Sequence, residues 1–291
     1  MDAFDQFPPL SEKEKRTLKK VEDLPRDGAV FPNEVLDLIR ERHGFKIFDP
    51  NIFTGIRLLH ADPVVFEVED FFTPRECDIY IAKSSEQQLE RRNGLKPEQL
   101  RSLTTSGQSQ FQQQRTSTTW FHHYASAPEL VAKASTLLGV EDYRHWEEPQ
   151  TVRYRPGERF SWHLDALPPP ETGASKGGQR TATVLVYLTN LKKGAGGATA
   201  FRDLGPLRVY PKKGKCLVFF PSFGGKAGSP LDGRTLHAGE VVSNGGKAKD
   251  KYIAQLWCHK RPYPPAVPVG NSHEAAEKPI AKYIKEWQGT S

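Results

Sequence analysis

The chain has 291 residues, of which 37% are hydrophobic and 26% charged, a balance typical of a folded protein with a sizeable core. Its longest apolar run, at residues 181–188, is far shorter than the roughly 20 residues of a membrane helix, so no membrane partner is expected. The net charge of +6 comes from scattered lysines, which are typical of a solvated surface and predict no nucleic-acid partner. No basic segment followed by an apolar stretch opens the chain, and its three cysteines are widely spaced, so we expect a cytoplasmic protein with reduced thiols.

Residues 1–60 are expected to form a helical N-terminal extension. Within it, the apolar spacing of NEVLDLIRERHG predicts a helix over residues 33–44 that ends at its glycine. Alternating apolar residues then predict a strand over residues 64–72. Thr73 followed by Pro74 is the pattern of a helix start, with the threonine as N-cap and the proline in the first position.

A polar, glutamine-rich segment follows at residues 93–115. It has no clear period, so it is interpreted as a mobile loop or lid, with a solvated linker as the alternative. A second candidate lid lies at residues 166–179. Between the two, the amphipathic pattern of residues 127–139 predicts another helix.

From about residue 148 the sequence changes to short β-rich runs separated by turns, which predicts an all-β core. Eight such runs favour a jelly roll, that is, a double-stranded β-helix, with flanking α-helices and an α+β architecture overall. We assign residues 61–260 to this domain and residues 261–291 to a C-terminal coil and helix packed on it. The eight predicted strands are 149–155, 159–165, 181–190, 197–201, 207–211, 215–221, 235–242 and 251–258.

Three residues on these strands have the types and spacing of a metal site. His163 and Asp165 are two apart, so they point to the same face of a strand. His237, on a later strand, is the candidate third member. Two histidines and one carboxylate leave three open positions on a metal, which an oxygen-activating Fe(II) centre needs. The same set also suits catalytic zinc, and each histidine alone also fits an ordinary hydrogen-bonded residue.

Four further residues fit an iron oxygenase that uses 2-oxoglutarate. Lys251 begins a predicted strand inside the barrel and offers a fixed cation for the far carboxylate of that cosubstrate, with a surface lysine as the alternative. Thr199, in a glycine-rich hairpin, offers a hydroxyl. Tyr154 and Tyr187 offer phenols, although both also fit core tyrosines.

The ordered motifs VRYRPGERFSWHLD, TATVLVYLTN, GAGGATAF, KGKCLVFFP, TLHAGEVV and KYIAQLW resemble the prolyl-4-hydroxylase-like branch of the Fe(II)/2-oxoglutarate oxygenases. The resemblance covers about residues 64–260. It implies Fe(II), 2-oxoglutarate and O2 as cofactor and cosubstrates, with ascorbate as a stimulating reductant. The residues that it implies are His163, Asp165 and His237 as iron ligands, Lys251 as the partner of the 2-oxoglutarate carboxylate, and Tyr154, Tyr187 and Thr199 around the cosubstrate.

The basic residue is the one place where the sequence departs from the family. Members often carry it about ten residues after the second histidine, where this chain has Lys247. We prefer Lys251, because KYIAQLW matches the run from lysine to tryptophan in the family. The segment NGGKAKD is then a loop insertion.

The resemblance implies a dioxygenase that oxidises an aliphatic C–H bond. We favour a small acidic substrate with a proline-like or amino-acid skeleton, hydroxylated or cyclised as in the natural-product enzymes of the kainoid-synthase kind. Arg115 and Trp257 are the candidate substrate contacts, against a surface arginine and a core tryptophan as alternatives. A peptidyl-prolyl 4-hydroxylase acting on a protein is the alternative function. A non-catalytic interaction module and a nucleic-acid demethylase are more remote, since the metal set is intact and the paired arginines of a demethylase are missing.

Overall fold

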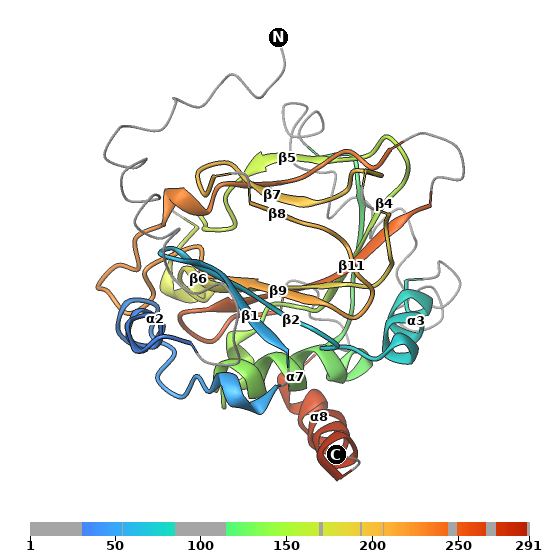
Figure 1. Ribbon diagram of the computed structural model, residues 1–291. Coiled ribbons are helices and arrows are strands. Elements are labelled where there is room, and N and C mark those ends of the chain that lie inside the picture. The colour runs from blue at the N-terminus through green and yellow to red at the C-terminus, as the bar shows by residue number, and fades with distance from the viewer. Residues whose placement is uncertain are drawn as a thin grey trace.

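Two antiparallel β-sheets form the centre of the structure, and helices cover the outer face of the larger sheet (Figure 1). The computed structural model describes residues 31–53, 55–84, 115–168, 171–192, 194–205, 207–243, 249–265 and 272–289. The large sheet consists of β1 (Ile56–Ala61), β2 (Val64–Val68), β9 (Cys216–Phe219), β6 (Arg180–Tyr187), β11 (Lys251–His259), β4 (Gln150–Tyr154) and β3 (Thr118–Phe121), in that order. The small sheet consists of β5 (Phe160–His163), β10 (His237–Gly239), β7 (Thr199–Phe201) and β8 (Arg208–Val209), in that order.

All eight predicted strands are present, and they are divided equally between the sheets. Strands β4, β6, β9 and β11 lie in the large sheet, whereas β5, β7, β8 and β10 form the small one. This arrangement is the predicted jelly roll. The large sheet is extended at one side by β2 and β1 and at the other by β3, which makes it wider than the small sheet.

The helices begin largely where the sequence predicts, but the helix predicted over residues 73–92 ends at Ala82, because Lys83 and Ser84 form a turn. Helix α3 (Pro74–Ala82) starts at Thr73, whose side chain accepts a hydrogen bond from the Glu76 backbone N–H in a capping box. Helix α7 (Pro128–Leu138) ends at Gly139, which has a φ of 63°. The C-terminal helix α8 (His273–Gly289) packs on the domain (Figure 1). Short 3₁₀ turns occupy Pro50–Ile52, Tyr124–Ser126, Tyr143–His145, Ala174–Lys176 and Gly233–Thr235.

The N-terminal helix differs from the prediction. Only α2 (Asn33–Asp37) is α-helical, and Leu38–Arg42 continue as a π-helical turn. Both segments keep the predicted apolar face, since Val35 and Ile39 are buried. The apolar spacing identified the buried face correctly, but a period of 3.6 residues does not separate an α-turn from a local π-turn.

Two hydrophobic clusters hold the layers together. One lies between the large sheet and the helices, where α7, α8 and the N-terminal segment bury their apolar faces. The other fills the space between the two sheets. Strand β1 runs across the predicted boundary at residue 60 and pairs with β2, so the division into extension and domain stays a prediction. In the part of the chain that the structure describes, no helix has the length and apolarity needed to cross a membrane.

Candidate metal centre

The structure brings His163, Asp165 and His237 together at one end of the small sheet. His163 is the last residue of β5 and lies directly opposite His237, the first residue of β10. Asp165 follows β5 by two residues. One ligand atom from each of the three side chains lies within 4.8 Å of the others. The Nε2 atoms of His163 and His237 are 3.5 and 3.7 Å from the Asp165 carboxylate oxygens.

Backbone carbonyls fix the orientation of both imidazoles. The Nδ1 of His163 is 2.8 Å from the Ser161 carbonyl oxygen, and the Nδ1 of His237 is 3.0 Å from that of Thr235. Each Nδ1–H therefore donates to the backbone, so Nε2 is the ring nitrogen that each histidine turns toward Asp165. Burial, followed by the neighbouring His163, lowers the pKa of His237 to about 4, so this ring is neutral and available as a ligand at pH 7.

Asp165 is buried and ionised. Burial opposes its ionisation, but His237, His163 and Arg180 hold the pKa of its carboxyl group well below the usual range. The hydroxyl of Thr183, on β6, donates a 2.7 Å hydrogen bond to Oδ2 of Asp165. This bond links the triad to the large sheet and orients the carboxylate between the two imidazoles.

We expect Thr183→Val to weaken metal binding while preserving the fold. The substitution keeps the side-chain shape and removes the hydroxyl that donates to Asp165. Loss of such an outer partner of a metal ligand costs roughly 10- to 100-fold in metal affinity or activity. Anaerobic Fe(II) titration measures the effect, and an unchanged affinity would show that Thr183 does not orient the ligand.

The donor set fits Fe(II), because two imidazole nitrogens and one carboxylate on one side of a metal leave the other side open. No other group of three or more potential His, Cys, Asp or Glu ligands is found in the described residues. The site can therefore bind a metal and two further ligands, such as a bidentate cosubstrate and dioxygen.

Lys251 lies inside the barrel, as predicted. It begins β11 opposite Tyr154, is 1% exposed, and takes part in none of the ion pairs seen among the described residues. Its ammonium lies 4.7 Å from the centroid of the Tyr154 ring and 5.8 Å from that of Tyr187. Burial lowers the pKa of Lys251 to about 7, with Glu240 opposing the shift. A buried cation without a carboxylate partner fits a site for an anionic ligand.

The remaining predicted cosubstrate residues surround Lys251. The Tyr187 hydroxyl donates a 2.8 Å hydrogen bond to the Thr199 hydroxyl, which joins the two sheets. Gly239, two residues after His237, lies so close to Tyr154 that an added Cβ would be 3.4 Å from the phenol oxygen. Lys251 and the side chains around it thus lie beside the triad along β10. Lys247 lies outside the described residues, so the choice between the two lysines stays a prediction.

Arg115, predicted as a substrate contact, packs on the Phe160 ring, which in turn stacks on the candidate metal ligand His163. Its guanidinium lies over the Phe160 ring at 4.6 Å, and that ring stacks on His163 with centroids 3.6 Å apart. Its Nε and one terminal nitrogen donate to the hydroxyls of Ser117 and Thr119. These contacts leave less of the guanidinium for a substrate carboxylate than the sequence suggested.

Trp257, the other predicted substrate contact, belongs to a charged group that the sequence did not reveal. The Arg180 guanidinium lies 3.7 Å above the Trp257 ring and donates to both Glu147 and the Asp165 carbonyl oxygen. His259 approaches the same Glu147 carboxylate at 2.6 Å. The group forms a wall on the large-sheet side of the triad. No local motif could have revealed it, because Arg180 and Glu147 are 33 residues apart.

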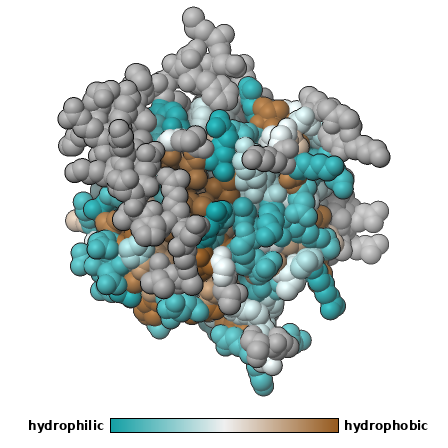
Figure 2. All heavy atoms as spheres, viewed as in Figure 1, coloured by the Kyte–Doolittle hydropathy of each residue, from teal (hydrophilic) through white to brown (hydrophobic). Residues whose placement is uncertain are grey.

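In the view of Figure 2, apolar side chains gather in the middle of the molecule and hydrophilic ones surround them. The candidate lid at residues 93–115 lies outside the described residues except for Arg115, and residues 169 and 170 of the second candidate lid are also outside them.

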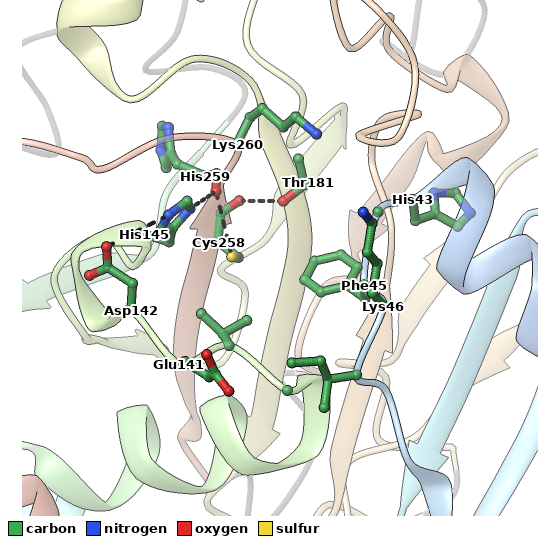
Figure 3. A pocket seen from close by; sticks show the side chains of 14 residues that line it. His43, Phe45, Lys46, Glu141, Asp142, His145, Thr181, Cys258, His259 and Lys260 are labelled. Atoms are coloured by element: carbon green, nitrogen blue, oxygen red, sulfur yellow. Dashed lines mark hydrogen bonds and ion pairs between the residues drawn. The ribbon is translucent and has the colours of Figure 1, made fainter.

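A separate pocket of about 260 Å³ lies on the outer side of the ends of β6 and β11 (Figure 3). Thr181 and Cys258 lie at the strand side of this pocket, and the Thr181 hydroxyl donates to the Cys258 carbonyl oxygen. None of the three triad residues lines it. The pocket is therefore not the metal site.

The comparisons with known proteins agree with this geometry. Residues 149–259 match the model of the 2OG-Fe(II) oxygenase superfamily. The chain is 28% identical to "Prolyl 4-hydroxylase 2" of Arabidopsis thaliana in an alignment of 227 residues, with coverage of 70% of each chain. It is 30% identical to "Prolyl 4-hydroxylase subunit alpha-3" of Mus musculus over 210 residues, which is 70% of this chain and 35% of that one. Among solved structures, it is similar to a viral collagen prolyl hydroxylase from Paramecium Bursaria Chlorella virus-1, with a TM-score of 0.49, 24% identity, and coverage of 66% of this chain and 94% of that chain.

Proposed function

This chain is a prolyl-4-hydroxylase-like Fe(II)/2-oxoglutarate oxygenase, and on that premise we propose that it hydroxylates a proline residue within a peptide. The observation that carries the proposal is the extent of the similarity. It covers 70% of both chains in the Arabidopsis thaliana comparison. The family match at residues 149–259 includes the triad, Lys251 and Trp257.

One group of residues in the site would bind the metal, and another would bind 2-oxoglutarate. His163, Asp165 and His237 would hold Fe(II) through Nε2, a carboxylate oxygen and Nε2. The Lys251 ammonium would pair with the far carboxylate of 2-oxoglutarate, with the Tyr187 and Thr199 hydroxyls beside it. When bound, iron and 2-oxoglutarate supply the oxidation with O2: 2-oxoglutarate becomes succinate and CO2, and one oxygen atom enters a substrate C–H bond.

The walls of the site suit a saturated ring held between flat side chains. Phe160 lies on the small-sheet side, stacked on His163. Trp257 and the Arg180 guanidinium form the opposite, large-sheet side. Because Arg180 is paired with Glu147, this wall carries little net charge and favours a neutral group over an acidic one.

A small acidic substrate of the proline-like kind is the second candidate. Arg115 favours it, since this guanidinium lies over the Phe160 ring, which stacks on the triad residue His163. Oxidation of such a molecule by hydroxylation or ring closure uses the same metal centre. The two candidates differ in whether the substrate presents a free carboxylate or a peptide group.

A substrate panel separates the candidates. Purified protein with Fe(II), 2-oxoglutarate and ascorbate is incubated with proline-containing peptides and with free proline-like acids. The proposal expects succinate release coupled to a gain of about 16 Da on a peptide, which is the mass of one oxygen atom. Turnover of free acids alone, or a loss of about 2 Da from ring closure or desaturation, would favour the second candidate.

A further inference from the structure

Two glutamines lie opposite each other on the inner wall of the barrel. Gln150 on β4 pairs in register with Gln255 on β11, and the two residues are 1% and 5% exposed. Their neighbours two positions along the strands, Val152 and Ile253, belong to the hydrophobic cluster between the sheets. Residues two apart share a face of a strand, so both amides point into the barrel.

This part of the wall lies next to the metal ligands. Trp257 is two residues beyond Gln255 on β11 and pairs in register with Thr183, whose hydroxyl bonds to Asp165. Gln150 is therefore diagonal to Trp257 across the β4–β11 pair. Long side chains in diagonal positions are within reach of each other. The Gln150 amide and the Trp257 indole thus follow one another along the inner face of the large sheet, and Thr183 links this face to Asp165 of the triad.

Two hydrogen-bond donors of this wall lack partners. Within the described residues, neither the Nε2 of Gln150 nor the Nε1 of Trp257 has a hydrogen-bond acceptor, although both atoms are shielded from solvent. Leaving a buried donor unpaired lowers the stability of a folded protein, so such groups are uncommon and require an explanation. Two of them in diagonal positions on the inner wall beside the triad indicate that an acceptor on a ligand completes them.

The missing acceptor is expected to be neutral. Both donors are uncharged, and the nearby Arg180 is already paired with Glu147 and the Asp165 carbonyl oxygen. A carboxylate placed here would lose its hydration without gaining a free cation, whereas a carbonyl oxygen loses much less. The glutamine amide is a planar group on a rotatable bond, so it can turn toward an acceptor without moving the backbone.

We infer that Gln150, together with Trp257, binds a carbonyl oxygen of the peptide group next to the oxidised proline. Gln150 is then a specificity-determining residue that selects a peptide over a free acid. The inference rests on the proposed function and adds to it the group on the substrate that is recognised. It also predicts that the unpaired donors are a feature of the ligand-free protein and acquire a partner when the peptide binds.

A double-mutant cycle between enzyme and substrate tests the inference. The peptide is made with an ordinary amide or with a thioamide on either side of the proline, since sulfur accepts hydrogen bonds poorly. With the wild-type protein, one of the thioamides should lower kcat/KM about 3- to 10-fold, the range of one neutral hydrogen bond. With Gln150→Met, which keeps the length of the side chain and removes its donor, the ordinary peptide should lose part of this rate, and the thioamide should cost less than with the wild-type protein, because only the Trp257 donor remains.

Gln179→Met is the matched control. The Gln179 amide is fully used, since it accepts from the Leu167 backbone N–H and donates to the Leu167 carbonyl oxygen. This variant should have a lower Tm and keep the wild-type thioamide penalty. In contrast, Gln150→Met should keep or raise the Tm, because it removes an unpaired buried donor.

The outcomes separate this inference from the proposed function. If no proline peptide is oxidised, the proposed function is wrong. If peptides are oxidised but Gln150→Met and a second variant, Trp257→Phe, both keep the full thioamide penalty, only the inference about the carbonyl is wrong. A reduced penalty in either variant, with an unchanged penalty in Gln179→Met, supports it.

Discussion

Replacing Asp165 by alanine is expected to reduce 2-oxoglutarate turnover to the level of Fe(II) in buffer while the protein remains folded. The carboxylate is the only anionic member of the triad, and its two oxygens lie 3.5 and 3.7 Å from the two histidine Nε2 atoms. Without it, only the two imidazoles of the triad are left to hold the metal. Changes in outer partners of metal ligands already cost roughly 10- to 100-fold, so the loss of a ligand should exceed that.

Succinate release and anaerobic Fe(II) titration measure this effect. The fold should persist, because the jelly roll is held by two hydrophobic clusters and not by the metal site. Removing Asp165 also relieves a buried charge, so the Tm of the variant in the absence of metal should change little. Asp142→Ala, which alters an aspartate paired with Arg144 on the surface, is the control and should keep full turnover. Full turnover by the Asp165 variant would remove this residue from the metal site.

Replacing Lys251 by alanine is expected to raise the 2-oxoglutarate requirement by about 10- to 150-fold, the range for a hydrogen bond to a charged group. Lys251 is buried beside Tyr154 and Tyr187, where no water replaces a lost ammonium. Lys247→Ala should change little. If the Lys247 variant is the impaired one, the assignment of residues 244–248 to a loop insertion is wrong.

The same lysine predicts how 2-oxoglutarate affinity depends on pH. Its pKa is about 7 in the free protein, because burial favours the neutral amine. A bound carboxylate favours the ammonium and raises that pKa. Affinity should therefore be highest below pH 7 and fall by up to tenfold per pH unit above it. Calorimetry in buffers of different ionisation enthalpy should detect proton uptake on binding at pH 8, and this uptake should disappear in Lys251→Ala.

Local patterns in the sequence predicted much of the fold and the centre of the site. Alternating residues between turns marked the eight strands, and a spacing of two placed His163 and Asp165 on one side. His237 and Lys251 were found because a metal and an anion require particular residue types on facing strands. These patterns depend only on neighbours in the sequence or on the chemistry of the ligand.

The features that were missed depend on register between distant strands. Thr183 reaches Asp165 from another sheet, and Glu147 joins Arg180 to His259, from which it is 112 residues away in sequence. Single threonines, arginines or glutamates carry no signal for such partners. Strand β1 was missed as well, since IRLLHA has no strict alternation of apolar and polar residues.

The division of the site between the sheets has a consequence for the choice of cosubstrate. His163 and His237 belong to the small sheet, whereas Lys251 and Tyr187 belong to the large one. Facing sheets keep a nearly constant separation of about 10 Å, because the side chains between them are close-packed. The distance from a metal at the triad to the Lys251 ammonium is therefore set by the packing between the two sheets and not by a loop. With Fe(II) at the triad and the far carboxylate on Lys251, as proposed, a dicarboxylate one carbon shorter or longer than 2-oxoglutarate would contact only one of the two, so the separation of the sheets would select the length of the cosubstrate.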